Sequence, residues 1–347
     1  MRAIGERSVG VSRGGRSIKP LRAVLLAVLV TPIIAAQVQG AAPLRMVQTI
    51  LLPNVKGRID HLAVDLKEQQ LFVAALGNNT VEVIDLQTGT RMRTIRGFHE
   101  PQGIIVIPEF KKMFVANGGS GAVDIFNGDS LNLRTSVKLP DDADNIRYDP
   151  ATKYIYVGYG SGALGIVHAG SGERLGDIPL AGHPESFQLE KSGSRIFVNV
   201  PTAKQIAVID REKRAVVARW PLTEAQSNFP MALDDTRHRL FVGFRKPARL
   251  IVFDTDSGQA VAALNSSGDC DDVFYDGVAR RIYLSCGEGF IDVVEQRDAD
   301  HYKTIAKVRT AKGARTSLFA PDLNRLYLAV PRYGNRDAEV RVYEVQP

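Results

Sequence analysis

The residues best suited to chemistry in this sequence fall at two neighbouring positions that recur every 41 to 44 residues. Five of these fourteen residues are Asp or Glu, whereas Asp and Glu are only 38 of the 347 residues in the chain, so one or two would be expected. The first position holds Asp60, Gln102, Asp144, Glu185, Phe229, Asp271 and Arg315. The second holds His61, Gly103, Asn145, Ser186, Pro230, Asp272 and Thr316.

Oxygen ligands drawn together in this way suit a hard cation such as calcium, magnesium or manganese. The candidate metal ligands are Asp60, Asp144, Asn145, Glu185, Asp271 and Asp272. A metal there would polarise a carbonyl and activate water, with His61 or His183 as the base. Raised carboxyl pKa values or a cationic ligand would also relieve the repulsion between these carboxylates. The alternative is that these residues belong to solvated polar loops and form no binding site.

The recurring positions lie twelve and eleven residues before an aromatic residue that repeats seven times. These aromatic anchors are Phe72, Phe114, Tyr156, Phe197, Phe241, Tyr283 and Tyr327. Each is followed by Val or Leu and then by a small residue or Asn. Within each unit, short alternating runs separated by turns predict four β-strands and no helix.

Seven such units predict a seven-bladed β-propeller with four-stranded antiparallel blades. The last unit ends without a fourth strand, and an unassigned strand, Leu44–Ile50, precedes the first unit. We therefore expect this segment to complete blade seven, which closes the ring and removes an open edge. The first strand of each blade lines the central channel of a propeller, so the two polar positions are expected to converge at one channel mouth.

Basic residues in the turns between second and third strands are expected on the same face. Together with the polar rings they form a candidate binding surface for an anionic group: Gln102, Arg245, Lys246, Arg315, Thr316 and Arg332. Solvation alone is the alternative explanation for charged turns.

Three segments resemble the Tyr-Val-Thr-Asn (YVTN) repeats of the YncE-like propellers, which are exported bacterial proteins. They read FVAALGNNTVEVID (72–85), FVANGGSGAVDIF (114–126) and YVGYGSGALGIV (156–167), and none contains the full tetrad. The resemblance implies a binding protein for a small ligand or another protein, rather than an enzyme. The alternative is a metal-dependent hydrolase, since some lactonase-type propellers hold a divalent cation at this mouth.

The N-terminal residues 1–40 predict a signal peptide, with residues 41–347 as the propeller. Six Lys or Arg residues precede the apolar run Ala23–Ala36, and small residues follow around Gly40. The run spans roughly 21 Å as a helix, which is too short to cross a bilayer; a retained anchor is the alternative to cleavage. We expect a periplasmic or secreted monomer with no membrane span after cleavage.

The remaining 307 residues carry 38 basic and 37 acidic side chains, a net charge of +1 that argues against nucleic-acid binding. They also contain both cysteines, Cys270 and Cys286, which flank one predicted hairpin. A hairpin turning near Gly277 would set Asp271 opposite Cys286, close enough for a disulfide in an oxidising compartment. Two free thiols are the alternative.

Overall fold

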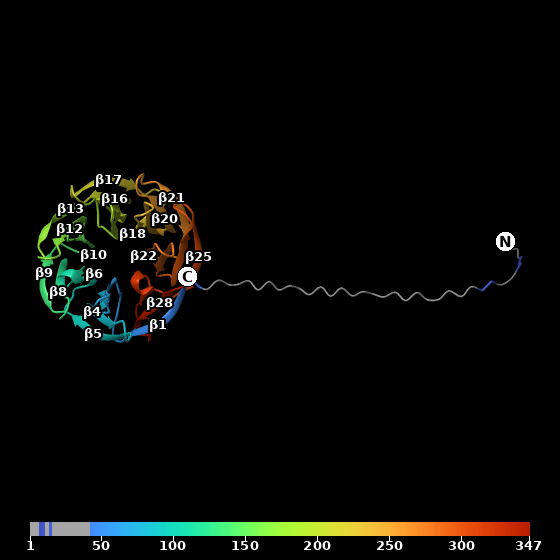
Figure 1. Ribbon diagram of the computed structural model, residues 1–347, viewed down its shortest axis with the longest axis horizontal. Coiled ribbons are helices and arrows are strands. Elements are labelled where there is room, and N and C mark those ends of the chain that lie inside the picture. Colours follow the sequence, from blue (N-terminus) through green and yellow to red (C-terminus); the bar gives the residue numbers. More distant parts are fainter. Residues whose placement is uncertain (1–6, 11–13, 16–41) are drawn as a thin grey trace, which may run out of the picture. The chain divides into compact units, whose positions relative to one another are not determined.

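The computed structural model describes residues 7–10, 14–15 and 42–347, and most of the predicted signal peptide lies outside them. Residues 42–347 form seven four-stranded antiparallel sheets arranged in a ring (Figure 1). The seven-bladed propeller predicted from the repeat is therefore confirmed. Among the described residues there is no helix of the length and hydropathy that a membrane crossing requires.

Each blade runs from a strand at the channel to a strand at the rim. The channel strands are β2 (Leu62–Asp65), β6 (Pro101–Ile107), β10 (Ala143–Asp149), β14 (Phe187–Leu189), β18 (Gln226–Asp234), β22 (Cys270–Asp276) and β26 (Ser317–Ala320). The second strands are β3 (Gln70–Ala75), β7 (Lys112–Asn117), β11 (Tyr154–Tyr159), β15 (Arg195–Val200), β19 (Arg239–Lys246), β23 (Arg281–Cys286) and β27 (Arg325–Val330). The third strands are β4 (Thr80–Asp85), β8 (Ala122–Asn127), β12 (Ala163–His168), β16 (Gln205–Asp210), β20 (Ala248–Asp254), β24 (Phe290–Gln296) and β28 (Ala338–Val345). The rim strands are β5 (Thr90–Arg96), β9 (Leu133–Lys138), β13 (Arg174–Pro179), β17 (Ala215–Pro221), β21 (Ala260–Asn265), β25 (Tyr302–Arg309) and β1 (Leu44–Leu52). Short 3₁₀ turns lie at η1 (Leu76–Asn78), η2 (Pro108–Phe110), η3 (Pro201–Ala203) and η4 (Pro321–Leu323).

An Asp or Asn ends the third strand in several blades and fixes the turn to the rim strand. Asp85 Oδ1 accepts hydrogen bonds from the backbone N–H groups of Gln87 at 2.7 Å and Thr88 at 2.9 Å. Asp254 Oδ1 accepts from Asp256 and Ser257 in the same way, at 3.2 and 2.8 Å. These side chains satisfy turn amides that no strand partner reaches, so the hairpin forms from local sequence.

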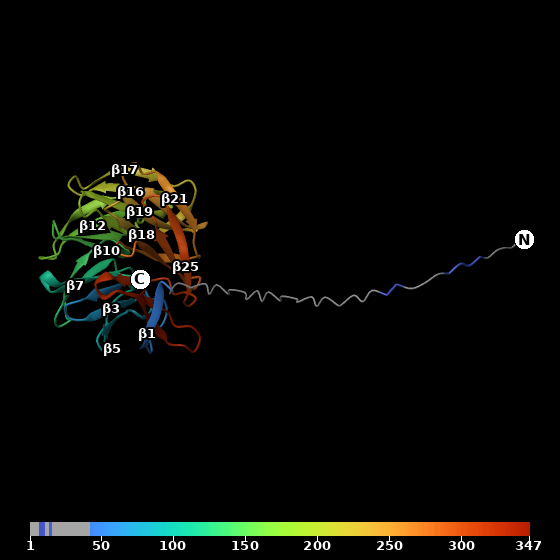
Figure 2. The ribbon, with the colours of Figure 1, turned by 45° about the vertical axis from the view of Figure 1, so that its right-hand side comes forward.

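The ring closes through β1, which pairs antiparallel with β28 from Leu44 opposite Val345 to Leu52 opposite Ala338 (Figure 1). The predicted closure of blade seven by the N-terminal strand is therefore confirmed, with two more residues in the strand than expected. The C-terminal end of the chain lies beside β1, where the Gln346 N–H donates to the Pro43 carbonyl at 2.9 Å (Figure 2).

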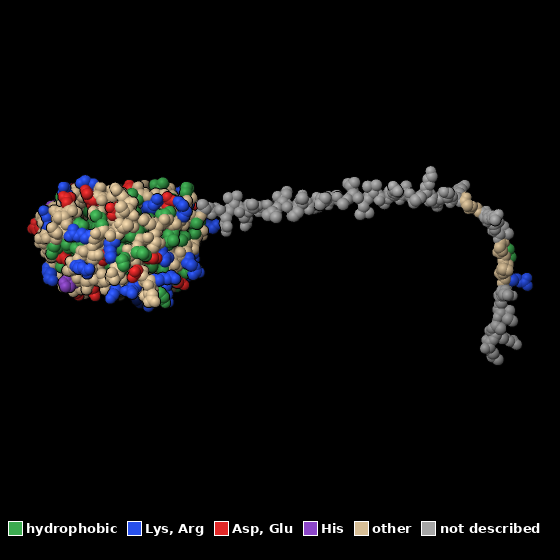
Figure 3. Space-filling view, turned by 90° about the horizontal axis from the view of Figure 1, so that it is seen from below, with side chains coloured by type: hydrophobic (Ala, Val, Ile, Leu, Met, Phe, Trp, Pro, Cys, Tyr) green, Lys and Arg blue, Asp and Glu red, His purple; other side chains and the backbone are tan. Residues whose placement is uncertain are grey.

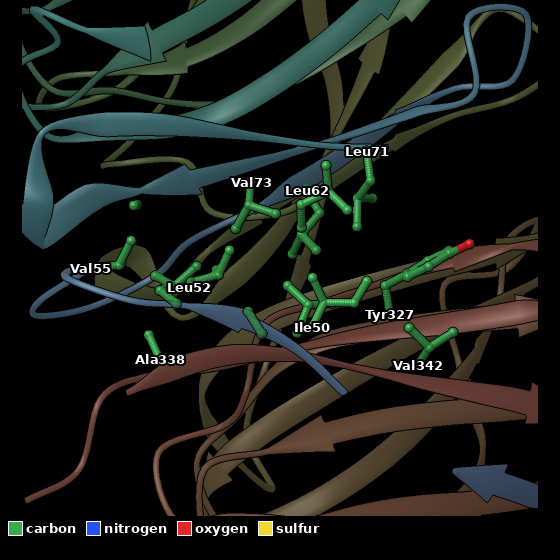
Figure 4. Close-up of a cluster of buried hydrophobic side chains, with 14 of the residues drawn as sticks. Ile50, Leu52, Val55, Leu62, Leu71, Val73, Tyr327, Ala338 and Val342 are labelled. Carbon is green, nitrogen blue, oxygen red and sulfur yellow. The ribbon is translucent and has the colours of Figure 1, made fainter. Parts of the chain in front are cut away.

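The core lies between neighbouring blades, and all seven aromatic anchors are buried in it, with at most 4% of the residue exposed. Between blades seven and one, Ile50 and Leu52 of β1 and Tyr327 of β27 pack with Leu71 and Val73 of β3 (Figure 4). Full burial of each such side chain contributes about 1.5–3 kcal/mol. The anchor recurs because every interface between blades needs one large side chain at the same place.

Candidate functional site

The polar positions identified in the sequence lie at the start of the channel strands. Strands β2, β14 and β26 begin directly after the second polar position. β6, β10, β18 and β22 begin earlier, and each is interrupted at these positions by a β-bulge. A bulge re-aims side chains out of the regular alternation, so it turns the polar residues toward the axis.

Blades two and three approach so closely at the axis that one of these positions must be glycine. A Cβ placed on Gly103 would lie 2.2 Å from the backbone oxygen of Asp144. The glycine at this point of the ring is therefore required by the packing of the channel wall.

Six of the seven residues at the first polar position line a single cavity of about 220 Å³, the channel mouth. They are Gln102, Asp144, Glu185, Phe229, Asp271 and Arg315. The seventh, Asp60, lines a constriction of about 20 Å³ next to the mouth, together with His61, Asn145 and Ser186. The geometry thus brings together the residues that the repeat aligned.

Three further residues of the mouth, Arg58, Asp142 and His183, come from one position that the sequence reasoning did not align. It lies fourteen residues before each anchor and carries Arg58, Glu100, Asp142, His183, Ser227, Asp269 and Gly313. Extending the count by two residues, the period of a strand, would have identified Arg58 and Asp269.

Arg58 is the main compensating charge that the sequence analysis missed. Its guanidinium lies 2.7 Å from Asp60 Oδ2 and 4.0 Å from Asp271 Oδ2. With five N–H donors and only these two carboxylates within 4 Å among the described residues, it retains donors for a ligand.

Asp271 is held by two more arginines. Arg245 Nη2 donates to Asp271 Oδ1 at 2.5 Å, and Arg315 Nε lies 2.9 Å from Asp271 Oδ2. Arg315 Nη1 also donates to both carboxylate oxygens of Asp269 at 3.0 Å. The Arg245 guanidinium stands 3.9 Å from the centre of the Phe229 ring, a cation–π contact that explains the aromatic residue in an otherwise polar ring.

His61 occupies the gap between two carboxylates, with Nε2 at 3.5 Å from Asp60 and Nδ1 at 3.6 Å from Asp272. Burial opposes its protonation, but Asp60 and Asp272 outweigh that effect and raise the pKa of His61 to about 10. Burial raises the pKa of Asp60 to about 6, against the lowering effects of His61 and Arg58. The two groups therefore form an ion pair at neutral pH.

His183 lines the mouth, with Nε2 3.8 Å from Asp144 Oδ2 and Nδ1 2.7 Å from the Gly160 carbonyl oxygen. The interaction with Asp144 raises the pKa of His183 to about 9. Glu185 has no ion pair within 4 Å among the described residues, and burial, with the nearby charge of Asp144, raises its pKa to about 8. At neutral pH and without a bound metal, His61 and His183 are thus charged and Glu185 is largely protonated.

The remaining predicted site residues are placed differently. Thr316 is buried, and its hydroxyl donates to the Ile59 carbonyl at 3.2 Å. Lys246 and Arg332 are exposed and do not line the mouth, so of the predicted basic turn residues Arg245 is the one that enters the cavity. No group of three or more His, Cys, Asp or Glu among residues 7–10, 14–15 and 42–347 is arranged to hold a metal ion, and the calcium, magnesium or manganese site stays a prediction.

A disulfide joins Cys270 and Cys286 beside the mouth. Cys270 pairs directly with Cys286 in the β22–β23 ladder, and the bulge falls at Asp271, one residue away from the register expected. The Cys270 carbonyl also accepts a hydrogen bond from Arg245 Nε at 3.3 Å. The crosslink therefore fixes the end of the strand that carries Asp271.

No protein-family model and no curated protein matches this chain. Among solved structures, a chain described as Kuenenia stuttgartiensis hydrazine synthase superposes with a TM-score of 0.72 at 16% sequence identity. The match covers 84% of this chain and 98% of that one. At this identity the likeness establishes the propeller fold and leaves activity to be argued from the site itself.

Proposed function

We propose that this protein is an exported, non-enzymatic binding module of the YVTN/YncE-like kind that binds a small anionic ligand at its channel mouth. The charge of the mouth carries the proposal. Four cations line it, Arg58, Arg245, Arg315 and His183. Within the lining they face Asp142, Asp144 and Asp271, since the raised pKa of Glu185 keeps that group largely neutral. Asp60 and Asp269, outside this lining, pair with Arg58 and Arg315 and leave some of their N–H donors unused.

Cationic side chains with unused donors attract an anion more strongly in a partly enclosed cavity than in open solvent. Planar guanidinium groups also match carboxylate and phosphate oxygens in two-point contacts. Basic and acidic side chains are intermixed on the face shown in Figure 3, so this face has no continuous basic surface of the kind that binds nucleic acid.

The test is calorimetric titration of the purified mature protein with succinate, inorganic phosphate and succinamide, the last a neutral match for succinate. We expect an anion to bind more weakly as salt increases, and succinamide not to bind. Arg58→Gln should weaken anion binding at least tenfold, since a charge-assisted hydrogen bond is lost. Arg134→Gln, an exposed rim change, is the matched control and should have no effect.

Equal binding by succinamide and succinate, or no binding of either anion, would contradict the proposal. So would stoichiometric calcium, magnesium or manganese in the purified protein, removed by a chelator and lost in the double variant Asp144→Asn, Glu185→Gln. That result would instead support the metal-dependent hydrolase.

A further inference from the structure

Beyond the constriction, the channel opens into a second cavity of about 230 Å³, which we call the inner chamber. It shares His61 and Ser186 with the constriction, and its lining includes none of the three arginines of the mouth. Its wall is mostly apolar and includes Leu62, Ile104, Ile146, Met231, Val273 and Phe274. The inner chamber is therefore a separate compartment with a chemistry of its own.

Three charged residues also line the chamber: His61 and Asp272, which face each other, and Arg147. The position nine residues before each anchor holds Ala63, Ile105, Arg147, Gln188, Ala232, Phe274 and Leu318. Arg147 is the only charged member of this set. Since the equivalent strands fold without a charge there, the propeller itself does not require an arginine at this place.

Arg147 has no carboxylate within 4 Å among the described residues. Its Nη1 donates to the neighbouring Ile146 carbonyl at 2.8 Å, and the guanidinium lies 5.6 Å from the centre of the Phe187 ring. The nearby carboxylate of Asp272 is already engaged: Oδ1 with His61 at 3.6 Å, and Oδ2 with the Ser317 N–H at 2.7 Å. The guanidinium therefore keeps unused donors in an apolar cavity.

Arg147 is half-buried, and a cation withdrawn from water without a carboxylate partner is costly. An anion in the chamber would offset that cost. The neighbouring His61 does not compete for this anion, because it lies between Asp60 and Asp272.

We propose that the inner chamber binds a small organic monocarboxylate, with its carboxylate on Arg147 and its apolar body against the hydrophobic wall. One unpaired guanidinium matches one carboxylate in a two-point contact. The cavity is smaller than the about 300–1,000 Å³ of sites for drug-sized ligands, which limits the ligand to a short aliphatic or single-ring acid. The proposal is independent of the mouth, whose arginines belong to a different cavity.

The test compares benzoate with benzamide, which has nearly the same shape and no charge. Calorimetry on the wild-type protein should show benzoate binding at least tenfold more tightly than benzamide. A crystal structure with 4-bromobenzoate, located by the anomalous signal of bromine, should place the carboxylate on Arg147. Equal affinities, no binding of benzoate, or bromine in the mouth with none beside Arg147 would overturn the proposal.

Variants separate the two cavities. Arg147→Gln should weaken benzoate binding at least tenfold, whereas the exposed Arg134→Gln should leave it unchanged. Benzoate binding that depends on Arg58 and not on Arg147 refutes the inner site while supporting the mouth. If Arg147→Gln fails to fold, the wild-type comparison of benzoate with benzamide and the position of bromine decide the matter.

Discussion

Replacing Glu185 with Gln should make the stability of the propeller less dependent on pH. Glu185 is largely protonated at neutral pH because burial and the charge of Asp144 raise its pKa to about 8. Glutamine has nearly the same shape and never ionises, so the variant keeps the neutral form of the side chain at every pH. The comparison therefore isolates the cost of placing one more negative charge in the channel mouth.

The sign follows from the direction of the pKa shift. Below its usual pKa of 4.5, Glu185 is protonated in both folded and unfolded chains, and the folded state is at its most stable with respect to this group. As pH rises from 4.5 toward 8, only the unfolded chain releases the proton, so the free energy of unfolding falls. The full difference in pKa corresponds to up to about 5 kcal/mol. Because the side chain borders solvent in the mouth, we expect about 2 kcal/mol.

The measurement is urea unfolding at pH 5, 7 and 9 for the wild type, Glu185→Gln and the exposed control Glu173→Gln. The wild type should lose about 2 kcal/mol more than Glu185→Gln between pH 5 and 9. Glu173→Gln should follow the wild type. Parallel profiles for the wild type and Glu185→Gln would show that the carboxyl ionises freely in the folded protein, and the charge count on which the proposed function rests would then be wrong.

Two further changes test the scaffold around the site. Replacing Cys286 with Ser should lower the free energy of unfolding by about 3 kcal/mol, since the disulfide closes a short loop of the unfolded chain. Urea unfolding of the wild-type protein with and without a reductant checks this prediction. An unfolding midpoint that the reductant leaves unchanged would contradict the crosslink. Gly103→Ala should cost about 1–3 kcal/mol because its Cβ would collide with the Asp144 backbone oxygen. The control is Gly277→Ala, whose Cβ would meet its nearest neighbour at an ordinary 3.6 Å, and equal melting temperatures for the two variants would refute the packing argument.

Much of the fold could be predicted because its signals repeat within short stretches of sequence. The aromatic anchor of each blade, the alternation of apolar and polar residues along its strands and the turns between them can each be recognised from residues a few positions apart. Even ring closure could be inferred, since the last repeat lacks a strand and the segment beginning at Leu44 supplies one. The alignment of repeats also identified most residues of the channel mouth before any geometry was known.

The sequence by itself therefore determined the number of blades, their closure and the set of polar residues directed to the axis. Only the tertiary structure decided how the charges at the axis are paired. Arg58 from the first blade reaches Asp271 from the sixth, and Arg315 from the seventh reaches both Asp269 and Asp271. Such contacts depend on where bulges turn each side chain and on how blades meet around the channel. These are distances between remote segments, which no local period encodes.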